Sequence, residues 1–250
     1  MDTTKQIIRQ EEAGFTLVEL AVVLVIIGLL LGGILKGQEL IATAQVNATI
    51  AQMKGIDAAM STFKDKYGQL PGDLSNFARL ANCANLCAVN GDADGRIESG
   101  DNTGMPQPSI APAVNEEGAV AFAHMAAAGL LQSIRYDAGS GLLFGELLPE
   151  AKAGGGMWLG FTVDGNPATT TALRPGHVLV YTGQVANLAV NSNGALAGSQ
   201  AAQIDRKLDD GVAATGSVSS NGTACRDAGN NIDYDETDAG LCHMYIQVQG

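Results

Sequence analysis

The stretch that decides the fold is residues 14–35, which read GFTLVELAVVLVIIGLLLGGIL. Between Phe15 and Leu35 the only ionisable side chain is that of Glu19. About 20 consecutive apolar residues in an α-helix span the core of a bilayer, so this segment has transmembrane length and is too long for a core strand. A secretory signal would end its apolar region with small residues at a cleavage site, and no such pattern precedes Lys36. The segment is therefore predicted to remain in the mature protein.

Glu19 is the costly residue in this segment. A carboxylate in the centre of a membrane helix costs roughly 2.5–3.5 kcal/mol on insertion scales, and less near the interface. An ionisable residue in such a place usually has a partner, which predicts a functional role for Glu19. The alternative is a side chain that only reaches back to the lipid headgroups.

The residues Gly14-Phe15-Thr16-Leu17-Val18-Glu19 resemble the processing site of type IV prepilins and type II secretion pseudopilins. In that family a membrane-embedded prepilin peptidase cuts after the glycine and methylates the new N-terminal phenylalanine. The resemblance implies cleavage after Gly14, methylation of Phe15, and a role for Glu19 in assembly, where it neutralises the N-terminal amine of a neighbouring subunit. The glycine-rich head resembles bacterial pilin-like proteins more loosely.

This resemblance also implies partners and a location. The expected partners are copies of the chain or other pilins in a filament, the prepilin peptidase, the inner-membrane assembly machinery and the membrane itself. The expected location is the bacterial inner membrane before assembly, and then a periplasmic or extracellular filament. Two alternatives stay open: a pseudopilin or minor pilin of a type II secretion system, and a membrane-tethered module that binds calcium or adheres to a surface.

Composition narrows the function classes. The chain has 250 residues and a formal net charge of −12, which disfavours nucleic acid as a partner and suits hard cations. It has three histidines, and it contains no Gly-x-Ser-x-Gly, phosphate-loop or His-Glu-x-x-His motif. No nucleophile is therefore paired with a base, and the chain is predicted not to be an enzyme.

The chain is expected to have three parts. Residues 1–14 form a polar leader, residues 15–67 form one long helix with an apolar assembly or transmembrane half at 15–35, and residues 68–250 form a globular head. The second half of the helix carries apolar residues every seven positions, which is typical of a face that packs on a core: Val46, Met53, Met60 and Tyr67. Gly68 and Pro71 then end the helix.

The head is predicted to have an α+β fold with an antiparallel sheet. Residues 119–131 are expected to form a buried helix with His124 in or beside the core, and Ser199 is expected to cap a helix at 200–208. Short runs rich in β-branched and aromatic residues, bounded by glycine and proline, predict strands at 157–163, 177–182 and 244–248.

The four cysteines lie in two local pairs, Cys83 with Cys87 and Cys225 with Cys242. Because a membrane helix that exports the head places it in an oxidising compartment, two disulfides are predicted. The alternative is a zinc site, but the sequence offers no histidines at matching spacing.

Residues 90–101 read NGDADGRIESGD and have the spacing of an EF-hand calcium loop. Oxygen-bearing side chains occupy positions 1, 3, 5 and 12, glycine occupies position 6, and position 7 can offer its carbonyl. The predicted calcium ligands are Asn90, Asp92, Asp94, Arg96 through its carbonyl, and Asp101. The alternative is an acidic turn that is only solvated.

Overall fold

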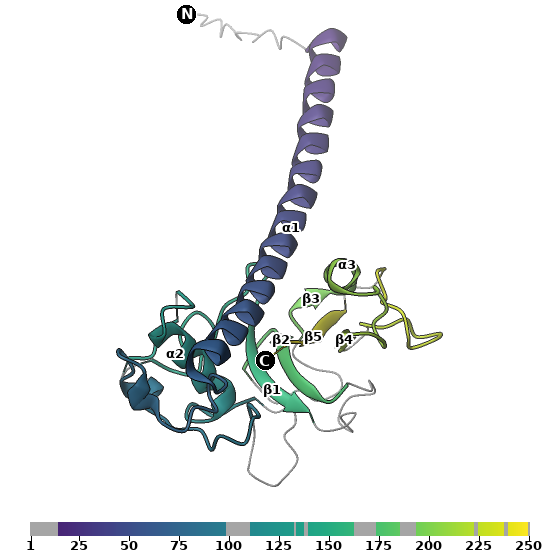
Figure 1. Ribbon diagram of the computed structural model, residues 1–250. Coiled ribbons are helices and arrows are strands. Elements are labelled where there is room, and N and C mark those ends of the chain that lie inside the picture. Colours follow the sequence, from purple (N-terminus) through teal and green to yellow (C-terminus); the bar gives the residue numbers. More distant parts are fainter. Residues whose placement is uncertain are drawn as a thin grey trace, which may run out of the picture. The chain divides into compact units, whose positions relative to one another are not determined.

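The computed structural model describes residues 15–98, 111–132, 134–137, 140–162, 174–185, 194–222, 225–237 and 240–249 (Figure 1). The chain divides into two compact units, with the boundary between Thr43 and Ala44. The second unit contains the α+β head.

Helix α1 runs from Leu17 to Tyr67, as the apolar pattern predicts. It stays an α-helix through its glycines, since Gly28, Gly32 and Gly33 all lie inside its bounds. Its end follows from Gly68, which adopts a left-handed backbone with φ of 73° and donates its N–H to the carbonyl of Lys64 at 2.7 Å.

The two halves of α1 differ in burial. Large apolar side chains from Phe15 to Ile41 are exposed, with Leu17 at 89% and Leu35 at 67%. The residues of α1 with buried side chains all lie after the boundary at Thr43: Val46, Thr49, Ile50, Met53, Ile56, Ala59, Met60 and Phe63. The predicted stripe at 46–60 is therefore a packing face of the head.

The head contains a five-stranded antiparallel sheet built around β5 (Leu241–Gln247). Strands β1 (Gly156–Thr162) and β2 (Gly176–Thr182) pair with each other, and β2 also pairs with β5. Strand β3 (Leu196–Ala197) pairs with Leu241 and Cys242 at the start of β5 (Figure 1). Strand β4 (Val218–Asn221) pairs with residues 243–246 of β5, on the edge opposite β2. The α+β class is confirmed.

Three of these strands were expected from the sequence, and two were not. The expected strands at 157–163, 177–182 and 244–248 correspond to β1, β2 and β5, although β5 begins three residues earlier. Val163 lies outside the described residues. Strands β3 and β4 have two and four residues, so they are too short to show an alternating pattern.

Helix α2 (Glu117–Ala127) packs on β1 and is shorter than the predicted span of 119–131. Gly129 has a φ of 76° and donates to the carbonyl of Ala126, and Leu130 donates to the carbonyl of Met125. This pair of bonds is a Schellman motif, in which a left-handed glycine ends the helix. Leu130 and Leu131 therefore lie beyond the helix.

Helix α3 (Gly198–Leu208) contacts β3, β4 and β5. The prediction that Ser199 caps this helix was wrong, because the cap position is Ala197. The Ala197 N–H donates to the side-chain oxygen of Gln200 at 3.2 Å. Alanine has no side-chain acceptor, so the sequence gives no capping signal at that position.

Candidate functional site

The start of α1 is organised by Thr16 and Glu19. The backbone N–H and the hydroxyl of Thr16 each donate to Oε2 of Glu19 at 2.8 Å. The backbone N–H of Glu19 donates in return to the Thr16 hydroxyl at 3.3 Å. This reciprocal arrangement is a capping box, with Thr16 as the N-cap and Glu19 at the third helical position.

The Glu19 carboxylate therefore has a partner within its own chain. Both hydrogen bonds fall on Oε2, and among the described residues none is recorded for Oε1. The Thr-x-x-Glu spacing is a known signature of this cap, so the sequence alone contained the signal. Phe15 is described and is 86% exposed, whereas Gly14 lies outside the described residues.

Cys83 and Cys87 form a disulfide, with their sulfur atoms 1.97 Å apart. His124 lies beside it, fully buried as expected for a core residue. Its Nδ1 accepts from the Gly72 N–H at 3.0 Å, so Nε2 carries the proton and donates to the Cys87 carbonyl at 3.1 Å. Burial lowers the pKa of His124 to about 4. Both sulfur atoms are oxidised in the disulfide, and zinc binds cysteine as the thiolate. The alternative of a zinc site is therefore wrong for this pair.

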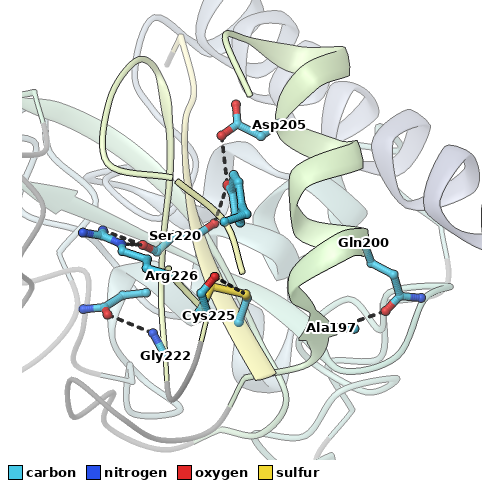
Figure 2. Close-up of a disulfide and its surroundings, with 10 residues drawn as sticks. Ala197, Gln200, Asp205, Ser220, Gly222, Cys225 and Arg226 are labelled. Atoms are coloured by element: carbon cyan, nitrogen blue, oxygen red, sulfur yellow. Dashed lines mark hydrogen bonds between the residues drawn. A yellow bond between two sulfur atoms is a disulfide. The ribbon is translucent and has the colours of Figure 1, made fainter. Parts of the chain in front are cut away.

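Cys225 and Cys242 form the second disulfide, with an S–S distance of 2.01 Å, and tie the loop after β4 to β5 (Figure 2). Beside it, the Arg226 Nε donates to the Ser220 carbonyl at 2.7 Å. The Tyr234 hydroxyl donates to Asp205 at 2.9 Å and lies 2.8 Å from the Ser220 hydroxyl. These bonds connect the loop to α3 and β4.

Asp205, Asp209 and Asp210 form a group of carboxylates, named the second carboxylate group to distinguish it from the group around Asp73. One carboxylate oxygen from each of the three residues lies within 4.8 Å of the others. Burial raises the pKa of Asp205 to about 6, although the hydrogen bond from Tyr234 opposes this shift. Each carboxylate in this group already accepts hydrogen bonds, including those from Gly211, Val212 and Val218. The group therefore serves the turn between α3 and β4.

The acidic loop at 90–98 has an Asx-turn structure. Asp92 accepts from the N–H of Asp94 at 3.1 Å, and Asp94 accepts from the N–H of Arg96 at 2.8 Å. Asn90 accepts from the N–H of Phe77 at 3.0 Å. Asp101, the last predicted ligand, lies outside the described residues.

The acidic loop lies against the carboxylates of Asp73 and Glu117, which are not part of the EF-hand-like pattern at 90–101. One carboxylate oxygen from each of Asp73, Asp92 and Glu117 lies within 4.8 Å of the others, and this group does not contain Asp94. Glu117 accepts from the N–H groups of Asp92 at 3.2 Å and Glu98 at 3.1 Å. Burial, with the nearby carboxylates adding to it, raises the pKa of Asp73 to about 6 and that of Glu117 to about 7.

Comparison with known proteins identifies the N-terminal segment. Residues 9–35 match the family described as "Prokaryotic N-terminal methylation motif". No curated protein and no solved structure matches the chain. The matched segment includes the Gly14-Phe15 junction, the Thr16–Glu19 cap and the exposed apolar turns of α1. The chain thus carries the signature of the type IV pilin and pseudopilin precursors that its N-terminal sequence resembles.

Proposed function

We propose that this protein is a structural subunit of a type IV pilus or a related filament. In this proposal the prepilin peptidase cuts after Gly14 and methylates Phe15, and subunits then assemble through the apolar part of α1. The observation that carries the proposal is the methylation motif at 9–35, which ends within a helix whose large apolar side chains are exposed.

The exposed apolar surface of α1 supports membrane insertion followed by assembly. Burying one large aliphatic side chain removes about 1.5–3 kcal/mol of unfavourable hydration. Exposed valine, leucine and isoleucine side chains recur in every turn from Leu17 to Leu35. Such a surface is stable in lipid or against the apolar helices of other subunits, and α1 is long and apolar enough to cross a membrane.

The proposed life cycle has two locations. The precursor is held in the bacterial inner membrane by α1, where the peptidase and the assembly machinery act on it. The subunit then passes into a periplasmic or extracellular filament made of its own copies or of other pilins. The two disulfides in the head suit an oxidising compartment outside the cytoplasm. The proposed role is structural, and the resemblance of the segment at 9–35 to pilin precursors supports it.

The test of this proposal is the mature N-terminus together with the contents of sheared filaments. Intact-mass analysis of the protein from its host should show loss of residues 1–14 and addition of one methyl group, and Gly14→Val should leave the precursor uncut. The mature chain should then be found in filaments sheared from cells or from the periplasm. A chain that retains Met1 would contradict the processing step. A processed chain that is absent from every filament would instead point to a membrane-tethered module.

A further inference from the structure

We propose that Asp73, Asp92 and Glu117 form a calcium-binding site in the head. The site differs from the EF-hand-like set expected from the sequence, because it shares only Asp92 with that set. It is also independent of the filament proposal, since it lies entirely in the second compact unit.

Three separate segments supply these carboxylates. Asp73 lies in the turn after α1, Asp92 lies in the acidic loop, and Glu117 is the first residue of α2. One oxygen from each lies within 4.8 Å of the other two. Two ligand oxygens on opposite sides of a calcium ion, each at about 2.4 Å, are separated by about 4.8 Å. The group is therefore already compact enough to share one calcium ion.

Asp73 provides a second, independent observation that points to a cation ligand. Its side chain is only 2% exposed. Oδ2 accepts from the Gly95 N–H at 3.1 Å, but Oδ1 is buried and has no hydrogen-bond partner among the residues that the structure describes. A buried carboxylate oxygen without a partner is costly, and it is rare in folded proteins unless an ion or water is bound. Oδ1 and Oδ2 are bonded to the same carbon. Oδ1 therefore lies close to Asp92 and Glu117, whichever of the two Asp73 oxygens faces them.

Two glycines hold the segments this close. Gly72 has a φ of 88°, and a Cβ at that position would lie 2.5 Å from the Glu117 carbonyl oxygen. A Cβ on Gly91 would collide with the backbone of Gly72 and Asp73. The backbone therefore brings three acidic segments close together, and a bound cation would offset the repulsion between their ionised carboxylates.

The chemistry of the site selects a hard cation. Carboxylate oxygens are the ligands preferred by calcium and magnesium, and three carboxylates offer three to six oxygens, with water able to complete six to eight. Magnesium needs oxygens at about 2.0–2.1 Å in near-ideal octahedral geometry. A site assembled from two loops and a helix end, in which a separate segment supplies each carboxylate, fits the larger and geometrically less demanding calcium ion.

The test uses the full-length precursor in detergent, with Trp158 as the probe of head unfolding. Trp158 is the only tryptophan in the chain and is fully buried in β1, so its fluorescence reports on the head. For a dissociation constant of about 10⁻⁴ M, 10 mM calcium should raise the melting temperature by about 5–10 °C over that in chelator. Magnesium at the same concentration should give a smaller rise, and an equal rise would contradict the choice of calcium.

Substitutions separate this site from the other acidic groups. Glu117→Gln and Asp92→Asn should remove most of the calcium response. Asn at position 92 keeps an oxygen that can accept from the Asp94 N–H. Gln at position 117 keeps an acceptor for only one of the two N–H groups, of Asp92 and Glu98, that Glu117 binds. Asp94→Asn, in the EF-hand-like set, and Asp209→Asn, in the second carboxylate group, should keep the response. The proposal fails if calcium does not move the wild-type melt. It also fails if Asp94→Asn abolishes the response while Glu117→Gln retains it.

Discussion

At the start of α1, one carboxylate has two roles to fill. Glu19 caps its own helix through Thr16, and in the proposed filament it also neutralises the amine of a neighbouring Phe15. The two roles are compatible because both intrachain bonds fall on Oε2. The cap holds the Glu19 side chain near the start of the helix. The side chain has therefore already lost conformational entropy in the free subunit, and less is lost on assembly.

Substitutions at Thr16 and Glu19 separate these roles. Glu19→Ala removes both the cap and the charge, and it should leave membrane insertion and cleavage intact but yield few or no filaments, because an amine buried in low dielectric then has no counter-charge. Thr16→Ala removes the hydroxyl contacts and keeps the charge, so filaments should still form. Quantifying sheared filaments against total mature subunit measures both outcomes. Equal loss in the two variants would assign Glu19 to capping alone.

His124 is the residue whose protonation should affect head stability most simply. Its pKa is about 4 in the folded chain, against an ordinary value of 6.5. Below pH 6.5 the unfolded chain binds a proton that the folded chain does not, so the free energy of unfolding falls as the pH drops from about 6.5 to about 4. The loss is on the order of 3 kcal/mol.

The measurement is the difference in unfolding free energy between wild type and His124→Gln across this pH range. A glutamine can accept from Gly72 and donate to the Cys87 carbonyl, and it does not titrate. As the pH falls from about 6.5 to about 4, the free energy of unfolding of the wild type should therefore decrease relative to that of the variant. Other buried titratable groups, including Asp205 and Asp73, are present in both proteins, so their contributions cancel in the difference. Parallel curves would show that His124 is solvated or protonated in the folded head.

At the scale of elements, the two disulfides should contribute unequally. In the chain-entropy model, closing the loop between Cys225 and Cys242 destabilises the unfolded state by about 3 kcal/mol, and closing the much shorter loop between Cys83 and Cys87 does so by about 2 kcal/mol. Replacing Cys225 and Cys242 with serine should therefore lower the free energy of unfolding more than replacing Cys83 and Cys87 does. Denaturant unfolding of the two variants measures the order, and the opposite order would mean that the region around His124 depends on its disulfide for packing.

Much of the fold follows from local patterns in the sequence. The apolar run at 15–35, the apolar repeat up to Tyr67 and the stop at Gly68 predict α1. Aromatic or β-branched runs between glycines predict β1, β2 and β5. The cap at Thr16 could also have been predicted, because its signature lies within four residues. The short strands β3 and β4 could not, since they exist only because β5 offers an edge.

The carboxylate group shows where local spacing fails. Gly95 and its acceptor Asp73 are 22 residues apart, and Asp92 and its acceptor Glu117 are 25 apart. A loop template considers only residues within one segment, so it selects Asp94 and overlooks both distant carboxylates. The clue available in the sequence is the pair of glycines at 72 and 91, whose role becomes visible only when the segments approach each other.

At the scale of the whole molecule, the position of the boundary at Thr43 has a consequence for truncation. The buried residues of α1 begin at Val46, so residues 1–43 contribute none of the buried α1 side chains. A chain of residues 44–250, exported to an oxidising compartment, should therefore be soluble without detergent. It should melt cooperatively, within a few degrees of the full chain in detergent.

A longer truncation provides the contrast. A chain of residues 51–250 also lacks Val46, Thr49 and Ile50, which are buried in the full protein. Losing two large buried aliphatic side chains costs about 1.5–3 kcal/mol each, which for a head of this size lowers the melting temperature by roughly 10 °C. Trp158 fluorescence follows both melts. If the 44–250 chain aggregates or melts as low as the 51–250 chain, the stability of the head depends on the apolar half of α1, and the boundary at Thr43 does not mark an independently stable unit.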